Sequence, residues 1–372
     1  MNNHVGIIGG GIAGLALSID LRKRGYPVTV IEKGEYPRHK VCGEYISMES
    51  HRYLLSLCPA LSAHELPRIN QFLFTAGSSK AISTSLSSGG FGISRYLLEE
   101  MLFVEAQKQG VLFMLGTKAR KVYPDPDSMG YVILTDKGKV VASLVCNSSG
   151  RQSNMHTGLS KGEKPKTNYV GVKYHLRLSR KLGQIEIHNF PGGYCGISDI
   201  EDGKSCLCYI VNSEKLKAAN NSIREMERIF LFRNPKLKEI FSKAEFVFKE
   251  PLTISGIQFQ SKVPVSDNIF YLGDSAGSIA PITGNGMSMG LRSAFMLGNS
   301  IEEYFNEAIC LYQLAGTYSS FWKKEFSGRI ERSRHLQKLS ESPFLAKRAI
   351  GLFRIFPSLF RTVIKQTHGQ AF

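Results

Sequence analysis

The sequence predicts an α/β protein: a Rossmann-like nucleotide-binding domain, an antiparallel β-sheet domain inserted into it, and a helical C-terminal tail. A buried strand, a glycine-rich turn and a helix open the chain over residues 4–23. Residues 166–255 have the pattern of strands, and a second strand–turn–helix passage follows at residues 269–277. From about residue 286 the apolar residues recur at helical spacing. This order indicates that the chain leaves the nucleotide-binding domain and later returns to it.

The first glycine motif, Gly9-x-Gly11-x-x-Gly14, has the order of a dinucleotide site. Gly9 allows a tight turn, Gly11 leaves room for a pyrophosphate, and Gly14 lets the helix pack close to the sheet. The amides at the helix N-terminus then face the phosphates with the positive end of the helix dipole. Glu32, after a second buried strand at 28–31, is placed to accept hydrogen bonds from ribose hydroxyls. The predicted cofactor contacts at this end are Gly9, Gly11, Ile12, Ala13, Gly14, Glu32 and Lys33.

Up to residue 150, spacing and turn residues predict two further helices and several strands. One helix covers about residues 47–57. The other begins at Ser94 and ends at Gly110, with apolar residues at helical spacing between them. The predicted strands are short segments within 68–93, a strand at 111–115, and a hairpin of 131–134 with 140–145.

The central block predicts strands at 169–178, 184–189 and 205–212, and a helix at 223–232. These elements define three expected regions. The nucleotide-binding domain comprises residues 1–67, 94–160 and 256–300; the sheet domain comprises 68–93 and 161–255; the basic helical C-terminal region comprises 301–372.

The composition of the chain limits the classes of protein to which it can belong. The chain has 372 residues, is 42% hydrophobic and carries a net charge of +16. No apolar run reaches the ~18 residues needed to span a membrane, and the first residues lack the basic leader of a signal peptide. The seven cysteines are scattered without a Cys-x-x-Cys pair, so neither a disulfide framework nor a zinc site is expected. We therefore expect a cytoplasmic protein without a bound metal.

A second motif lies far along the chain, at the end of another buried strand. Asp274 after Gly273 could hold the ribityl hydroxyls of a flavin, and the glycine-rich stretch 281–287 could aim helix N-terminal amides at the flavin pyrimidine edge. The helix dipole would then stabilise the negative charge of a reduced flavin. The alternative is a helix capped by Asp274 with an ordinary loop before the next helix.

Together these motifs resemble the aromatic-hydroxylase-like superfamily of FAD enzymes, which includes flavin monooxygenases, geranylgeranyl reductases and flavin-dependent halogenases. The resemblance covers residues 4 to about 300 and rests on the first glycine motif with Glu32, on Arg95 opening a helix, and on Gly273-Asp274…Pro281-x-x-Gly284-x-Gly286. It implies that the first motif binds the ADP half of FAD, that Arg95 contacts the cofactor and that Asp274 holds the ribityl chain. The further cofactor contacts expected are Lys40, Cys42, Gly43, Arg95, Gly273, Asp274, Pro281, Gly284, Asn285, Gly286 and Met287.

Two stretches favour the geranylgeranyl reductase and halogenase side of this superfamily. Pro37-x-x-Lys40-x-Cys42-Gly43 resembles a loop of those enzymes, and residues 190–196 are similar to a strand of their substrate domain that passes over the flavin. The halogenase Trp-x-Trp-x-Ile-Pro signature is absent, because the only tryptophan is Trp322.

NAD(P)H is the expected electron donor. An Ala-x-Asp-Gly stretch tied to NAD(P)H use in the superfamily is replaced by the turn at 147–150, which has no acid. This departure disfavours direct or tight NAD(P)H binding.

Candidate catalytic groups are few, since the flavin performs the chemistry in this superfamily. Tyr194 lies in the stretch expected over the flavin, Glu44 lies in the cofactor loop, and Lys173 shares one face of a strand with His175. Each has a structural alternative: Lys173 and His175 could line a solvated face, and Glu44 could form a surface salt bridge.

The sequence is compatible with three functions. The first is an FAD monooxygenase acting on a hydrophobic aromatic, polyketide-type or lipid-like substrate, which we favour slightly. The second is reduction of C=C bonds in an isoprenoid or related substrate. The third is a flavin-binding protein without turnover.

The C-terminal tail is strongly basic. Residues 321–372 hold 11 Lys and Arg against 3 Asp and Glu, and Phe344, Leu345, Arg348, Leu352 and Ile355 fall on neighbouring helical positions. The tail could bind a membrane surface, dock an acidic carrier protein, or pack on the enzyme with a solvated basic face. No nucleic-acid motif is present, so nucleic acid is not an expected partner.

Overall fold

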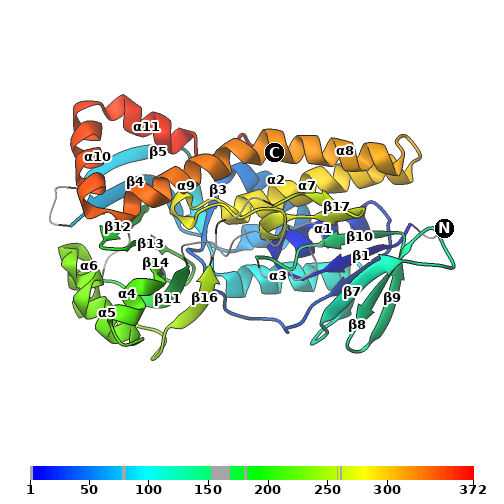
Figure 1. Ribbon diagram of the computed structural model, residues 1–372, viewed down its shortest axis with the longest axis horizontal. Helices are drawn as coiled ribbons and strands as arrows, with labels where there is room; N and C mark the ends of the chain where they lie inside the picture. Colours follow the sequence, from blue (N-terminus) through cyan, green and yellow to red (C-terminus); the bar gives the residue numbers. More distant parts are fainter. Residues whose placement is uncertain (1–2, 78–80, 152–167, 180–181, 258, 260–261) are drawn as a thin grey trace.

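The computed structural model describes residues 3–77, 81–151, 168–179, 182–257, 259 and 262–372. Two sheets lie side by side along the long axis, and the C-terminal helices run along one side of both (Figure 1). The predicted α/β fold class is confirmed. The expected domain boundary near residue 160 lies outside the described residues.

The Rossmann-like sheet has the order β17–β18–β10–β1–β2–β6. All neighbours in it are parallel except β17 and β18. Strands β1, β2 and β10 are buried along their whole length, which explains their continuous apolar runs. The strands are β1 (Val5–Ile8), β2 (Val28–Ile31), β6 (Leu112–Met114), β10 (Leu144–Asn147), β17 (Val265–Ser266) and β18 (Ile269–Tyr271).

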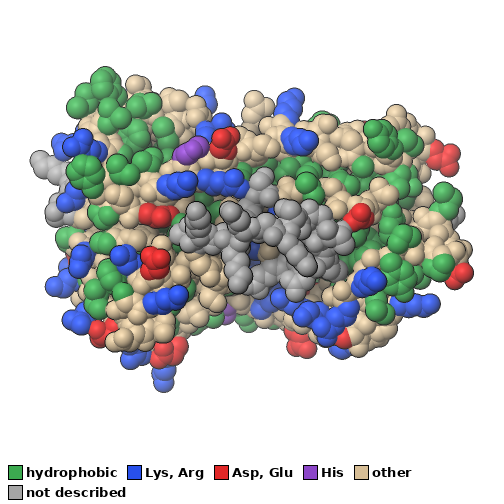
Figure 2. All heavy atoms as spheres, in the orientation of Figure 1, with side chains coloured by type: hydrophobic (Ala, Val, Ile, Leu, Met, Phe, Trp, Pro, Cys, Tyr) green, Lys and Arg blue, Asp and Glu red, His purple; other side chains and the backbone are tan. Residues whose placement is uncertain are grey.

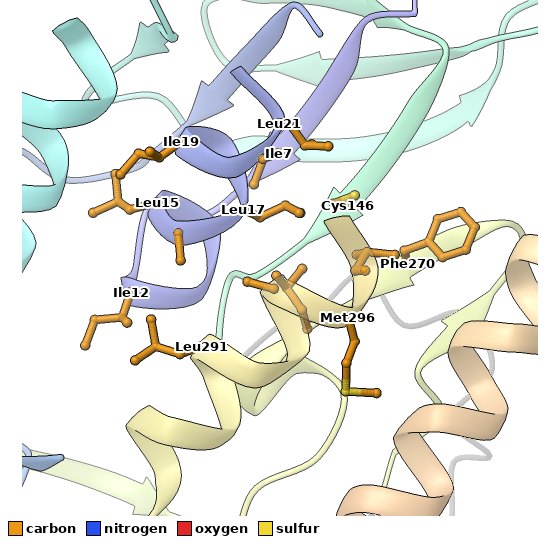
Figure 3. Close-up of a cluster of buried hydrophobic side chains, with 14 of the residues drawn as sticks. Ile7, Ile12, Leu15, Leu17, Ile19, Leu21, Cys146, Phe270, Leu291 and Met296 are labelled. Carbon is orange, nitrogen blue, oxygen red and sulfur yellow. The ribbon is translucent and has the colours of Figure 1, made fainter. Parts of the chain in front are cut away.

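Helices α1 (Ile12–Lys23), α3 (Arg95–Lys108) and α7 (Gly286–Phe305) cover this sheet, and α1 packs against both others. Figure 3 shows side chains of α1, α7 and the strands meeting in one apolar cluster. The predicted helix from Ser94 to Gly110 is confirmed as α3: the Ser94 hydroxyl accepts a hydrogen bond from the Leu97 amide at 3.1 Å, and Gly110 ends it with φ +79°.

The larger sheet has the order β15–β11–β14–β13–β12–β4–β5–β3, with β16 also paired to β11. It is antiparallel except for β4 and β12, which pair in parallel. Its strands are β3 (Tyr45–Ser47), β4 (Arg68–Ala76), β5 (Ile82–Gly92), β11 (Tyr169–Arg177), β12 (Gln184–Phe190), β13 (Gly193–Asp199), β14 (Ser205–Asn212), β15 (Glu245–Phe246) and β16 (Leu252–Ile257).

One face of this sheet is covered by α4 (Ser213–Ala218), α5 (Ile223–Ile229) and α6 (Pro235–Lys243). Tyr174, Leu176, Leu207 and Tyr209 point to these helices and form an apolar core with them. Residues one position along each strand therefore point to the opposite face, towards the nucleotide-binding domain. That face holds the candidate site.

The C-terminal region is helical, as predicted. α8 (Leu311–Trp322) and α9 (Gly328–Glu341) are joined by a π-helical turn at Lys323–Ser327, and α10 (Pro343–Ile355) and α11 (Pro357–Lys365) follow. α10 packs against α9, α11 and β4, and α11 packs against β5. These helices thus cover the end of the larger sheet formed by β4 and β5.

Several local predictions were wrong. The strand predicted at 140–145 is two strands, β9 (Gly138–Ala142) and β10, which belong to different sheets. β9 pairs with β8 (Tyr131–Thr135), which pairs with the unpredicted β7 (Ala119–Pro124). Residues 68–93 form two long strands rather than several short ones. The helix predicted at about 47–57 does form, as a 3₁₀ turn at Met48–Ser50 followed by α2 (His51–Leu57).

Candidate functional site

The glycine turn between β1 and α1 brings helix and strand very close together. Gly9 has φ +97°, in the left-handed region that favours glycine. A Cβ on Gly14 would lie 2.1 Å from the carbonyl oxygen of Gly9. Only glycine at position 14 therefore allows α1 to start at this distance from β1. Ile12 and Ala13 form the first turn of the helix.

Two cations lie in front of Gly11. A Cβ on Gly11 would have Lys40 Nζ at 3.6 Å and Arg95 Nη2 at 4.0 Å as its nearest neighbours among the described atoms. Lys40 comes from the loop before β3, and Arg95 opens α3. Both form ion pairs with Glu99, at 3.1 Å for Lys40 Nζ. The turn is thus open enough for a ligand and is faced by positive charge.

Arg38 is a third cation at this place. Its Nε lies 3.3 Å from Glu99 Oε2 and its Nη1 lies 2.7 Å from Glu32 Oε1. Three cations therefore share two carboxylates. Burial and the charge of Arg95 lower the pKa of Lys40 to about 8. Excess positive charge beside a helix N-terminus fits a pyrophosphate, so these residues fit the ADP half of FAD.

Glu32 lies at the end of β2, as the ribose-binding interpretation requires. Its carboxylate accepts hydrogen bonds from the amides of Gly10 at 2.7 Å and Gly34 at 2.9 Å. Burial acts to raise the pKa of Glu32, but Arg38 and the two amides outweigh it and the pKa is lowered. Glu32 is therefore an ionised acceptor at neutral pH. The adjacent Lys33 is exposed.

The second motif lies against the first. Gly273 has φ +59°, and a Cβ on it would lie 3.4 Å from the Cβ of Ala13. The carboxylate of Asp274 forms an ion pair with Arg151, whose Nε lies 2.9 Å from Asp274 Oδ2. Both side chains remain about one third exposed, at 33% and 30%. A ribityl chain at Asp274 would therefore also meet Arg151.

The loop before α7 contributes backbone rather than charge. Pro281 begins a 3₁₀ turn, and Gly284 ends it with φ +68°. Asn285 and Gly286 then start α7, where Met287 is buried. Asn285 Nδ2 donates to the carbonyl of Thr367 at 2.5 Å, whereas Asn285 Oδ1 is buried and has no hydrogen-bond partner. An unpartnered acceptor at a helix N-terminus fits a ligand that donates a hydrogen bond to this loop.

Glu44 is the centre of a buried ionic cluster. Its carboxylate accepts from Lys173 Nζ at 2.5 Å, from His175 Nε2 at 2.6 Å and from the Arg95 amide at 2.7 Å. Burial acts to raise the pKa of Glu44, but His175 and Lys173 outweigh it and the pKa is lowered. The interpretation of Lys173 and His175 as a solvated face is wrong, because both side chains are buried.

Cys206 lies in the same cluster. Its Sγ and the ligand atoms of Glu44 and His175 lie within 4.8 Å of one another, a spacing that could hold a metal ion. The Lys173 ammonium already occupies this carboxylate, so we assign an ion pair there rather than a metal. Cys206 Sγ also donates to the carbonyl of Cys42 at 3.2 Å. Residues 42–44 are thus held tightly on β11 and β14, and the carbonyl of Gly43 faces the Ser198 hydroxyl at 3.4 Å.

Tyr194 lies on the same face of the sheet as Lys173. Tyr194 pairs with Ile210, and Lys173 pairs with Cys208, two residues away on β14. Tyr194 itself is 3% exposed, and its hydroxyl has no hydrogen-bond partner. It packs among apolar residues that include Ile187 and Ile282. Burial raises the pKa of Tyr194 well above its ordinary value, so its phenol stays protonated.

An apolar cavity lies at the Gly284 loop, and Ile187 and Ile282 of its lining pack against Tyr194. β4, β5, β12, the loop before α7 and helices α9 to α11 enclose it. Its lining is aliphatic and aromatic except for a few groups such as Thr283 and His368. The main lining residues are Tyr45, Phe72, Phe74, Leu86, Ile185, Ile187, Ile282, Leu336, Leu339, Ala346, Ala349, Phe353, Phe360, Val363 and Ile364.

Three residues of the site were not singled out from the sequence as cofactor contacts: Arg38, Glu99 and Arg151. Arg38 lies within the loop that resembles the reductase side, and Arg151 follows the turn at 147–150 directly. For Arg38 and Arg151, the position next to motif residues is the sequence signal that could have identified them. Glu99 is one helical turn after Arg95 and is buried by the fold, so its role depends on tertiary contacts.

Comparison with known proteins agrees with this geometry. The family model for an NAD(P)-binding Rossmann-like domain matches residues 7–55. Three curated relatives are each 22% identical. Conditioned medium factor receptor 1 of Dictyostelium discoideum aligns over 88% of this chain and 69% of its own length. Tryptophan 2-halogenase of Chondromyces crocatus aligns over 80% and 60%. Digeranylgeranylglycerophospholipid reductase of Methanocaldococcus jannaschii aligns over 90% and 87%.

Solved structures show the same fold over almost the whole chain. The myxobacterial chondrochloren halogenase CndH superposes with a TM-score of 0.79 and 16% identity, covering 99% of this chain and 93% of that one. The P. aeruginosa enzyme PqsL superposes with a TM-score of 0.74 and 15% identity, covering 94% and 100%. The resemblance found in the glycine motifs is confirmed: the chain has the fold of flavin-dependent halogenases and monooxygenases.

Proposed function

We propose that this protein is an FAD-dependent oxidoreductase that acts on a hydrophobic substrate, and that it is a monooxygenase. The observation that carries the proposal is the apolar cavity, which reaches Tyr45 and Gly284 beside the residues expected at the flavin. A cavity with an aliphatic and aromatic lining suits a hydrophobic aromatic, polyketide-type or lipid-like molecule.

The cofactor, when bound, supplies the redox chemistry, and the protein supplies its position and the shape of the substrate site. Gly11, Lys40 and Arg95 would hold the pyrophosphate, and Glu32 would accept hydrogen bonds from the ribose. The Gly284 loop and the N-terminus of α7 would face the flavin edge. Tyr194, with a neutral buried phenol, packs against Ile187 and Ile282, which line the cavity.

In monooxygenation one atom of O₂ enters the substrate and the other leaves as water, with two electrons and two protons supplied. We propose NAD(P)H as the source of the electrons. The turn at Asn147–Gly150 contains no acid, so transfer through a reduced-flavin partner is the outcome to test against it. Halogenation is disfavoured because Trp322, the only tryptophan, is buried within α8, outside any Trp-x-Trp signature.

Reduction of C=C bonds is the second candidate function. Two observations favour it: the loop Pro37-x-x-Lys40-x-Cys42-Gly43, and the relative named as a digeranylgeranylglycerophospholipid reductase, which aligns over 87% of its own length. The apolar cavity would also suit an isoprenoid chain.

One experiment separates these functions. The purified protein is loaded with FAD, its flavin absorption is recorded, and it is reduced without oxygen in the presence of an alkylated phenol or an isoprenoid lipid. Product formed only after ¹⁸O₂ is admitted, with one labelled atom in it, supports the monooxygenase. Product formed without oxygen overturns it in favour of the reductase. A protein that takes up no FAD overturns both.

A further inference from the structure

Helices α10 and α11 expose an unusual number of apolar side chains. Of the 19 large apolar side chains that are exposed among the described residues, six lie within residues 344–359. They are Phe344, Leu345, Leu352, Ile355, Phe356 and Leu359, with exposed fractions from 41% to 71%. In Figure 2 apolar side chains gather at the upper left, over α10 and α11, with Lys and Arg side chains beside them.

The exposed residues of α10 form one stripe. At about 100° per residue, Phe344, Leu345, Leu352 and Ile355 fall within one sector of the helix. Ala346, Ala349 and Phe353 fall in the opposite sector and line the cavity. α10 is thus apolar on two faces, a pattern typical of a helix covered on both sides. Among the described residues, only the cavity face is covered by this chain.

Positive charge surrounds this stripe. Residues 342–372 contain five Lys and Arg and no Asp or Glu. All five, Lys347, Arg348, Arg354, Arg361 and Lys365, are exposed. The guanidinium of Arg348 lies 4.6 Å from the centre of the Phe344 ring. Long cationic side chains beside exposed Phe, Leu and Ile are the pattern of a helix that lies in a lipid–water interface.

We propose that α10 and α11 form a platform that binds the surface of an anionic phospholipid membrane. The platform consists of the six exposed apolar residues and the five cations named above. No helix among the described residues is long and apolar enough to cross a bilayer, so the contact is with the surface. This inference goes beyond the proposed function and does not depend on it.

The position of the cavity suggests a function for the platform. Leu339 on α9 lines the cavity and is 41% exposed, so the cavity opens to the surface beside α10. A membrane bound to the platform would lie next to this opening. A bilayer also suits the surface better than an acidic protein does, because apolar side chains outnumber cations on it and a bilayer can bury all of them together.

The test is flotation of the full-length protein with vesicles of phosphatidylcholine alone or mixed with phosphatidylglycerol. The wild-type protein floats with the mixed vesicles, and added salt weakens the binding. The double variant Ile355→Asp/Phe356→Asp loses it. Arg348→Gln/Arg354→Gln weakens it about 25-fold, because each cation near an anionic surface contributes a factor of about five.

Matched controls keep the test sharp. Met129→Asp/Tyr312→Asp changes two exposed apolar residues elsewhere, and Lys236→Gln/Lys243→Gln changes two exposed cations of α6. Both controls should float like the wild type, and thermal unfolding checks that every variant is folded. Three results would each overturn the inference. The wild-type protein does not bind the mixed vesicles, or the platform variants float like the wild type, or the protein is retained on an acidic acyl carrier protein instead of vesicles. Flavin absorption, measured separately, reports on the proposed function alone.

Discussion

Gly11 and Gly14 belong to one turn but leave different room for a methyl group. At Gly14 the methyl carbon would lie 2.1 Å from the carbonyl oxygen of Gly9, and this backbone atom cannot easily move away. We expect Gly14→Ala to lower the free energy of unfolding by about 3 kcal/mol or more, the upper range for overpacking. At Gly11 the nearest described atom is 3.6 Å away. Gly11→Ala should therefore keep its stability but bind FAD more weakly, as the methyl occupies the predicted pyrophosphate position. Chemical denaturation and FAD titration measure the two effects; equal stability of both variants would contradict this.

Lys40 should make FAD binding depend on pH. Its pKa in the free protein is about 8, lowered by burial and by Arg95. A bound pyrophosphate would raise that pKa towards the ordinary 10.5. Above pH 8 binding then requires uptake of a proton, so the dissociation constant for FAD should rise by up to about tenfold per pH unit. Fluorescence titrations across pH 7 to 10 would measure it.

Two variants at this position isolate the effect. Lys40→Arg keeps its charge over the whole range, so its FAD affinity should not change between pH 7 and 10. Lys40→Met should bind weakly at pH 7 and show the same flat profile. A wild-type affinity independent of pH would show that Lys40 does not face the phosphates.

At the scale of elements, Glu44 joins the cofactor loop to β11. We expect Glu44→Gln to destabilise the fold by about 3–5 kcal/mol, because Lys173 would remain buried without its counter-ion. Since the pKa of Glu44 is lowered, its contribution is present above the ordinary value of 4.5 and is lost as the pH falls through the lowered pKa. The stability difference between wild type and variant should therefore shrink below pH 4.5.

Glu239→Gln serves as the control for this variant. It removes an exposed ion-paired carboxylate of α6 and should leave stability unchanged. The role of Glu44 in catalysis stays a prediction.

Sequence spacing predicted elements best where one segment carries its own signal. The turn at Gly9 to Gly14, helix α3 with its Ser94 cap, and strand β11 all have local patterns, and all form. The boundary at residue 143 was missed because only Ser143 separates the apolar residues of β9 from those of β10, although the two strands enter different sheets. The parallel pairing of β4 with β12 joins residues more than 100 positions apart, so no local pattern could reveal it.

The same distinction holds for the site. Gly9, Gly11, Gly14 and Glu32 could be assigned from spacing because backbone geometry demands those residue types. The ion pair between Arg151 and Asp274 could not, because it joins two turns 123 residues apart. Burial of Lys173 was also hidden from the sequence, since a lysine on a strand is more often solvated.

At the scale of the whole molecule, the C-terminus fastens the tail to the nucleotide-binding domain. The ring of Phe372 packs against Tyr53 and Phe295, and the amide of Phe372 donates to the carbonyl of Glu49 at 3.2 Å. Arg292 donates to the carbonyl of Gln370. The tail thus crosses from the larger sheet to the other domain, and Thr367 and His368 on this path line the cavity. The shape of the cavity therefore depends on segments from the start, middle and end of the chain.

This construction allows the cavity to be filled without touching the cofactor residues. Ala349 lines it from α10, and none of the residues expected at the FAD contacts lies on that helix. Ala349→Phe should weaken the binding of a long-chain apolar probe by about tenfold or more, because the added ring takes up room the probe needs and the larger side chain also strains the packing. FAD affinity should be unchanged.

Gly351→Ala is the control on the same helix. A Cβ there meets nothing within 4 Å, so probe binding should stay normal while the helix gains up to about 1 kcal/mol of stability. Competition between the probe and candidate substrates, followed by fluorescence, measures both variants. Normal probe binding by Ala349→Phe would place the substrate elsewhere.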